Sequence, residues 1–133
     1  MHESFAPYSP TILAMATTGG LLLLQLVVAD VAGIRAGHTP GTPIAADHRD
    51  FLFRAARAHA NTNESVSAFV LLALFGILSA ASPAWINALA WTYAGARFSH
   101  MICYYAGFQV PRSVSFGIAM TALVGMLLAG LLS

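Results

Sequence analysis

The sequence predicts an all-α integral membrane protein, folded as an up-down four-helix bundle. Of its 133 residues, 58% are hydrophobic and only 8% are charged, whereas soluble domains usually carry about a quarter charged residues. Four apolar stretches each approach the ~20 residues with which a helix crosses the hydrocarbon core of a bilayer. The connections between these stretches are short, which favours antiparallel neighbours. The length suffices for one domain, residues 1–133, and no more.

The first two expected spans differ in how they begin. The span over residues 10–34 is apolar from its start and follows no basic segment, so we do not expect a cleaved signal peptide. A connection over residues 36–48, which holds two glycines and two prolines, is expected to be a loop. The span over residues 48–81 begins with polar residues, and Asp47 is its expected N-cap. Its apolar part, from Ser65 onward, is slightly short for a crossing, so the polar part is expected to extend the helix into the interface.

The third and fourth spans are expected over residues 84–106 and 112–132. Before the third span, Ser82 is expected to cap the helix and Pro83 to take its first position, while Trp85 marks the membrane interface. Small residues recur along the spans and permit close contacts within or between subunits, so we expect a homo-oligomer. The glycines concerned are Gly19, Gly20, Gly33, Gly117, Gly125 and Gly130.

The placement of the arginines predicts how the chain is oriented in the membrane. The six basic residues are all arginines, and four of them lie between the first span and the apolar part of the second, which begins at Ser65. The N-terminus, the connection between the second and third spans, and the C-terminus contain none. By the positive-inside rule, both termini face outward and the first and third connections face the cytoplasm. We expect an integral multi-pass protein of a bacterial inner membrane, in contact with lipid and without a nucleic-acid partner.

Two polar stripes run along the second and third spans. On a helix, the residues of each stripe fall within about 80° of one another, so each stripe is a face of its helix. The first comprises Arg54, Arg57, Asn61 and Glu64, and the second comprises Tyr93, Arg97, His100 and Tyr104. At ~1.5 Å of rise per residue, Glu64 lies roughly 25 Å from the outer end of its span and Arg97 roughly 18 Å from that of its own. The two stripes are therefore expected to meet in the cytoplasmic half of the membrane.

The charges at this depth predict an anionic ligand. A charged side chain that faces lipid near the bilayer centre costs from ~2.5 kcal/mol upward, so Arg97 is expected to face protein, water or an anion. Glu64 can neutralise one arginine, and Asp30 can pair with Arg35, which still leaves a positive excess. The arginines at this level are Arg35, Arg54, Arg57, Arg97 and Arg112. Because guanidinium groups suit carboxylates and phosphates, the stripes predict a cytoplasm-facing anion pocket between helices.

Several of these residues also have a plainer interpretation. Asn61 and Glu64 could join helices by hydrogen bonds alone. Arg49 and Arg54 could only set the topology and meet lipid phosphates. The histidines and the lone Cys103 lack the spacing of metal ligands, so no metal site is expected.

The polar residues occur in two motifs that resemble those of the MAPEG family, the membrane-associated proteins of eicosanoid and glutathione metabolism. The segment "RAHANTNE" is similar to the family's R-A-x-x-N-x-x-E signature, with Arg57, Asn61 and Glu64 in place. The segment "GARFSHMICYYAGFQVPRS" is similar to a second signature. Its matching positions are Arg97, His100, Tyr104, Pro111, Arg112 and Ser113. The length and the four-span layout agree as well.

The resemblance implies a homotrimer, similar to the microsomal glutathione transferases, that binds glutathione between neighbouring subunits near the cytoplasmic face. The glutathione-binding residues that it implies are Arg35, Arg57, Asn61, Glu64, Arg97, His100 and Tyr104. It implies a catalytic role for Arg112, with Ser113 as a hydrogen-bond donor. Positive charge and a helix N-terminus both lower the pKa of a thiol from its ordinary ~8.5. The thiolate would attack a lipophilic electrophile, or reduce a lipid hydroperoxide, that arrives from the bilayer.

The sequence departs from the family pattern around the second substrate. Ser65 and Ser67 stand where members often have a tyrosine and a proline, and Phe116 replaces a tyrosine of some synthases. We therefore expect a general glutathione transferase or peroxidase rather than an enzyme that makes an eicosanoid. The alternative is a non-catalytic membrane scaffold that binds glutathione or an anionic lipid headgroup. A small transporter is less favoured, because the spans show no inverted halves or broken helices.

Overall fold

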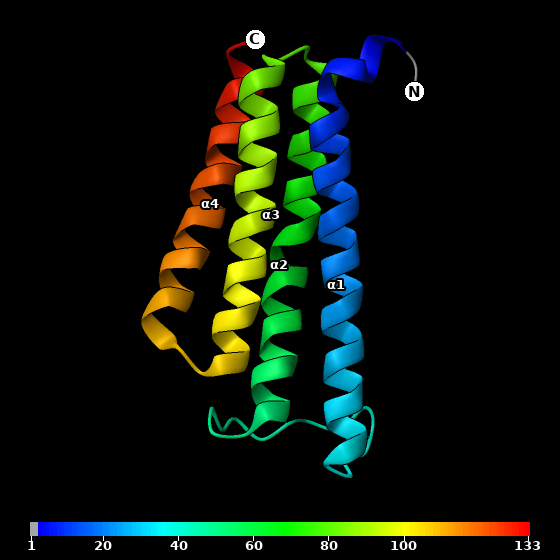
Figure 1. Cartoon of the computed structure of the whole chain (residues 1–133), viewed down its shortest axis with the longest axis vertical. Coiled ribbons are helices and arrows are strands. Elements are labelled where there is room, and N and C mark those ends of the chain that lie inside the picture. The colour runs from blue at the N-terminus through cyan, green and yellow to red at the C-terminus, as the bar shows by residue number, and fades with distance from the viewer. Residues whose placement is uncertain (1–2) are drawn as a thin grey trace.

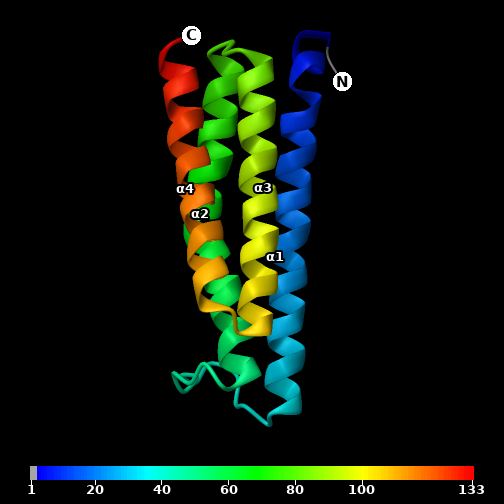
Figure 2. The ribbon, with the colours of Figure 1, turned by 60° about the vertical axis from the view of Figure 1, so that its left-hand side comes forward.

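Four long helices form an up-down bundle in the computed structural model, which describes residues 3–133 (Figure 1). They are α1 (Ser9–Arg35), α2 (Phe51–Leu78), α3 (Pro83–Ala106) and α4 (Gln109–Leu131), preceded by the short 3-10 helix η1 (Glu3–Tyr8). No strand occurs between residues 3 and 133. The α2–α3 turn and the beginning and end of the chain lie at one end of the bundle, and the other two connections lie at the opposite end (Figures 1 and 2). The predicted all-α four-helix fold is confirmed.

Three of the helices are long and apolar enough to cross a membrane: α1 together with η1 from Ser4 onward, α2 and α4. The remaining long helix, α3, has 24 residues and runs alongside the others in both views (Figures 1 and 2). It packs against each of the other three helices. Its most polar side chains, Arg97 and His100, are buried in the bundle. Helix α3 therefore keeps its charged side chain and its histidine inside the bundle.

The ends of the helices follow local chemistry, with one correction to the sequence prediction. Asp50, and not Asp47, is the N-cap of α2: its side chain accepts a hydrogen bond from the backbone N–H of Leu52 at 3.0 Å. Both aspartates precede the helix at a distance that suits a cap, so the pattern alone did not separate them. Pro83 takes the first position of α3, as predicted. Ser82 occupies the N-cap position, but its side chain makes no capping hydrogen bond.

The end of the bundle that holds the α2–α3 turn is closed by hydrogen bonds between distant parts of the chain. The Tyr8 hydroxyl donates to the carbonyl of Ala81 at 2.6 Å. Asn87 accepts from the Thr11 hydroxyl at 2.7 Å and donates to the carbonyl of Pro7 at 2.9 Å. These bonds tie the start of α1 to the α2–α3 turn and the first turns of α3.

The core is rich in alanine, which brings the helices close together. A central contact joins α2 and α3, where the rings of Phe69 and Tyr93 stack at 4.3 Å between centroids. The Tyr93 hydroxyl also shares a hydrogen bond of 2.7 Å with the hydroxyl of Ser65. The buried residues of this core are Ala14, Phe69, Ala73, Ala90, Tyr93, Ala94, Ala96, Ala119, Ala122, Leu123 and Met126.

Only some of the predicted small residues make close contacts within the chain. A Cβ at Gly125 would lie 2.9 Å from Leu89, and one at Gly130 would lie 2.5 Å from Phe75. One at Gly33 would meet a side chain only at 3.8 Å. The remaining three, Gly19, Gly20 and Gly117, have no neighbouring atom within 4 Å of such a Cβ. Of the glycines predicted to pack closely, those that tighten the bundle lie near the C-terminal end of α4.

Candidate functional site

The polar stripe of α2 points partly outward. Asn61 is half-buried, whereas Glu64 is exposed on the surface of the chain. An Arg57 Nη1 atom lies 3.8 Å from Glu64 Oε1, so the two side chains form an ion pair, with 39% and 62% of their surfaces exposed. Glu64 thus neutralises one arginine of its own helix, about two turns away.

The stripe of α3 points inward and meets that of α2 at Asn61. Arg97 has no exposed surface. Its Nη2 donates to Asn61 Oδ1 at 2.5 Å and to the Thr62 hydroxyl at 3.4 Å. Its Nε and Nη1 have no hydrogen-bond partner among the described residues. Arg97 therefore carries a buried charge whose strongest contact is a neutral amide.

Tyr104, near the end of α3, is surrounded by groups from three parts of the chain. The guanidinium carbon of Arg112 lies 4.4 Å from its ring centroid, within the range of a cation–π contact. The ring of His100 meets it edge-on at 5.1 Å. The ring of His48, from the α1–α2 loop, lies nearly parallel to it at 6.5 Å. Arg112 at the start of α4 is thereby held beside α3.

A small open cleft of about 220 Å³ lies between α2, α3 and α4 at this end of the bundle. Its lining residues are Asn61, His100, Tyr104, Arg112, Ser113 and Phe116. Five of the sequence-predicted site residues thus share one cleft. Arg57 and Glu64 lie on the neighbouring surface of α2, and Arg97 lies behind Asn61.

Ser113 lines the cleft with its hydroxyl already engaged. Helix α4 begins at Gln109, three residues before the expected start of the span at Arg112. Ser113 therefore lies in the second turn, where its hydroxyl donates to the Gln109 carbonyl at 3.2 Å. A hydroxyl so placed must rotate away from that carbonyl before it can donate to a ligand.

Arg35 lies apart from the cleft. It borders a separate groove between the end of α1 and the start of α2, together with Asp50 and Phe51. Asp30 does not pair with Arg35; among the described residues the ion pairs are those of Arg49 with Asp47 and Arg57 with Glu64. Five residues along a helix place two side chains about 140° apart, which is too far around α1 for a contact.

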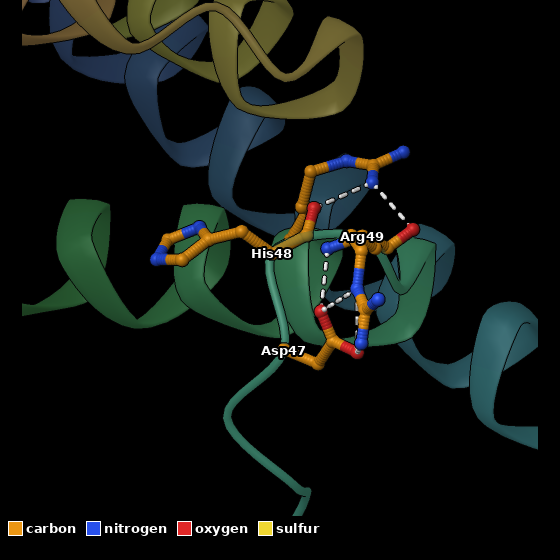
Figure 3. Close-up of polar contacts among 4 residues, drawn as sticks. Asp47, His48 and Arg49 are labelled. Atoms are coloured by element: carbon orange, nitrogen blue, oxygen red, sulfur yellow. Dashed lines mark hydrogen bonds and ion pairs between the residues drawn. The ribbon is translucent and has the colours of Figure 1, made fainter.

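Arg54 holds the end of the α1–α2 loop, a role that no local sequence pattern indicates. One of its terminal nitrogens donates to the backbone carbonyls of His48 and Arg49, at 2.8 and 2.9 Å (Figure 3). In the same view Arg49 turns to the carboxylate of Asp47, which it contacts at 2.9 Å. The hydrogen bonds from Arg49 lower the pKa of the Asp47 carboxyl below its ordinary value. Asp47 is therefore ionised at neutral pH.

Within residues 3–133, no three His, Cys, Asp or Glu side chains gather in a way that could hold a metal ion. The cleft chemistry is that of cations, amides and aromatic rings. Such a set can bind an anion and stabilise negative charge on a sulfur or oxygen atom.

Comparison with known proteins adds one finding. Residues 6–132 match the model of the MAPEG family. No curated protein and no solved structure matches the chain.

Proposed function

The chain belongs to the MAPEG family, and from this premise we propose that it is a membrane-bound glutathione transferase or peroxidase. In this proposal, glutathione binds at the cleft from the cytoplasmic side. A lipophilic electrophile or a lipid hydroperoxide reaches it from the bilayer. The family includes glutathione transferases and related proteins, and residues of both signature motifs line the cleft.

The observation that carries the proposal is the position of Arg112. It lines the cleft, half-buried, at the start of α4 and against Tyr104. Its charge and the N-terminus of α4 both favour a thiolate nearby. Glutathione has two carboxylates for cations such as Arg57 and an ammonium group for Glu64, so its charges suit this end of the bundle.

In the proposed reaction the thiol of glutathione loses its proton to water, and Arg112 stabilises the thiolate. Attack on an electrophile forms a carbon–sulfur bond and expels the leaving group with its electron pair. With a hydroperoxide, the oxygen–oxygen bond breaks. Two molecules of glutathione are then oxidised to the disulfide, and the products are an alcohol and water. Asn61, His100 and Tyr104 bind the tripeptide, and Ser113 contributes after its hydroxyl rotates.

We also propose that the protein works as a homotrimer. The cleft of about 220 Å³ is smaller than the ~300–1,000 Å³ typical of ligand pockets, so one chain accommodates only part of a tripeptide. The Glu64 side chain is 62% exposed at a depth where lipid contact is costly. A neighbouring copy that covers this face would both enlarge the site and shield the charge. Arg35 could reach glutathione only in this way, across a subunit boundary.

The test is conjugation of glutathione to a lipophilic electrophile by the purified protein, compared between wild type and Arg112→Ala. Loss of one charge-stabilising donor typically costs 10²–10³-fold in turnover, so we expect roughly a hundredfold fall. The matched control is Arg49→Ala, because Arg49 is an exposed arginine of the same end that contacts only Asp47. If the wild type neither conjugates nor reduces peroxide above a detergent blank, the enzyme assignment is wrong.

The second candidate is a non-catalytic scaffold that binds glutathione or an anionic lipid headgroup. The observation that supports it is that the cleft is open, so a headgroup can enter it. Thermal stabilisation separates the ligands: glutathione, an S-blocked analogue and an anionic lipid are compared at equal concentration. Equal stabilisation by the lipid indicates a headgroup site. In a scaffold that binds glutathione, Arg57→Ala weakens the stabilisation while there is no turnover to lose.

A further inference from the structure

The buried contact between Arg97 and Asn61 fixes the direction of an amide at the cleft. A guanidinium group has donors and no acceptor. The Asn61 atom that faces Arg97 Nη2 at 2.5 Å must therefore be the oxygen, which removes the usual ambiguity between the two ends of an asparagine amide. The Asn61 NH₂ group is left on the other side of the amide. No described residue accepts a hydrogen bond from it, and Asn61 lines the cleft.

Arg97 itself is set back from the cleft. It has no exposed surface and is not among the residues that line the cleft. Its Nη2 is fixed between Asn61 Oδ1 and the buried Thr62 hydroxyl. A ligand in the cleft of this chain therefore meets Asn61 first.

The charge of Arg97 is not cancelled inside the bundle. Buried charges are normally paired with an opposite charge, yet among the described residues the only carboxylate of this depth, Glu64, pairs with Arg57 at the surface. The guanidinium polarises the amide of Asn61, because hydrogen bonds in a chain strengthen one another in a medium of low dielectric constant. The NH₂ group of that amide is the end that Arg97 leaves free for a ligand in the cleft.

We propose that Arg97 is a positioning residue that acts through Asn61: it holds the amide so that a polarised N–H donor points at an anionic oxygen of the ligand. This inference deepens the proposed function, on which it rests for the identity of the ligand as glutathione. It differs from direct binding of the tripeptide by Arg97, which the sequence resemblance implies. It also explains why a buried, incompletely paired arginine is placed next to an asparagine and not next to an aspartate.

The first test needs no ligand. Melting temperatures are measured for wild type, Asn61→Asp, Arg97→Met and the double variant in the same detergent. With Arg97 present, the new carboxylate pairs with the guanidinium, so we expect Asn61→Asp to raise the melting temperature. In the Arg97→Met background the same change leaves a carboxylate without its partner. It should then lower the melting temperature, because breaking a buried pair is destabilising. If Asn61→Asp changes the melting temperature equally in both backgrounds, Arg97 and Asn61 do not interact and the proposal is wrong.

The second test measures the Kd of glutathione by calorimetry for wild type, Asn61→Ala, Asn61→Asp, Arg97→Met and the double variant Asn61→Ala/Arg97→Met. A hydrogen bond to a charged group corresponds to roughly tenfold or more in affinity. We expect that loss in Asn61→Asp despite its higher melting temperature, because the donor has become an acceptor. If Arg97 acts through Asn61, the double variant binds no more weakly than Asn61→Ala. Additive losses mean that Arg97 contacts the ligand directly, and they overturn the proposal.

The matched control is Asn63→Asp, which introduces the same charge on an exposed position of the same helix, and its Kd should stay within about twofold of wild type. A larger effect of Asn63→Asp would mean that the loss in Asn61→Asp is a general effect of charge, against the proposal. If the wild type binds no glutathione, the proposed function fails, and the melting temperatures alone decide whether Arg97 positions Asn61.

Discussion

Arg49 and Arg54 lie at the same end of the bundle, but their surroundings give them different tasks. Arg49 contacts the carboxylate of Asp47, and its side chain is 92% exposed. Arg54 is half-buried and donates to the carbonyls of His48 and Arg49. Surface ion pairs contribute little to stability, whereas a guanidinium bound to backbone carbonyls fixes the course of a loop.

Replacing Arg54 should therefore loosen the α1–α2 loop. We expect Arg54→Ala to increase the rate at which a protease cuts between residues 36 and 50, because two backbone carbonyls lose their donor. Limited proteolysis followed by mass spectrometry measures the rate at each site. Arg49→Ala serves as the control and should be cut at nearly the wild-type rate. Equal rates for Arg54→Ala and wild type would show that the loop is held by other contacts.

The sequence predicted which residues share a face more successfully than what each side chain contacts. Periodicity placed Arg97 and His100 on one side of α3, and both are buried there. It could not show that Arg97 would bind Asn61 in preference to Glu64, since both lie on the same stripe of α2 within one turn. The contact of Arg112 with Tyr104 likewise depends on how α4 packs, and no local pattern encodes it.

At the level of helices, one close approach fixes the packing of α2 on α3. Gly76 of α2 lies against Ile86 of α3, and a Cβ added to it would be 2.5 Å from the Ile86 Cδ1 atom. Ile86 has no exposed surface, so its side chain has little room to move. The approach of these two helices thus depends on the absence of one methyl group.

We expect Gly76→Ala to destabilise the bundle by about 1–3 kcal/mol, as overpacking of a core usually does. The free energy of unfolding in mixed micelles is the measurement. Ile86→Val removes the atom that the new methyl group would meet, so it should restore part of the loss in the double variant. Gly19→Ala, where a Cβ has no neighbour within 4 Å in the chain, should cause no comparable loss. If Gly76→Ala and Gly19→Ala change the free energy of unfolding equally, the close approach of Gly76 to Ile86 does not determine how α2 packs on α3.

The boundaries of the helices were harder to predict than their number. Asp47 and Asp50 both suit a cap by type and position, and only the hydrogen bond to Leu52 identifies Asp50. Helix α4 starts at Gln109, three residues before the expected start of the fourth span at Arg112. A proline is tolerated anywhere in the first turn, so Pro111 could not fix which residue comes first.

For the molecule as a whole, the proposed orientation places both chain ends outside and the cleft at the cytoplasmic surface. The arrangement of the connections is consistent with this, because the α1–α2 loop, which contains Arg49 and is flanked by Arg35 and Arg54, lies at the end of the bundle that carries the cleft (Figure 1). Positively charged loops remain on the cytoplasmic side. Water-soluble glutathione would then enter from the compartment that contains it.

Labelling with a membrane-impermeant maleimide tests this orientation in intact cells. The lone Cys103 is first replaced by serine, and single cysteines are introduced as Thr42→Cys in the α1–α2 loop and Ser133→Cys at the end of α4. We expect Ser133→Cys to react in intact cells and Thr42→Cys to react only after permeabilisation. The reverse pattern would place the cleft on the outer side and remove the proposed route for glutathione.

The hydrogen bonds of Tyr8 and Asn87, at the end of the bundle with the α2–α3 turn, have a consequence for biosynthesis. Their partners lie more than seventy positions apart along the chain, from Tyr8 to Ala81 and from Asn87 to Pro7. While the ribosome is still synthesising α2, the hydrogen-bond partners Ala81 and Asn87 have not yet been made. The start of the first helix therefore lacks these hydrogen bonds until the third helix has been inserted into the membrane beside it.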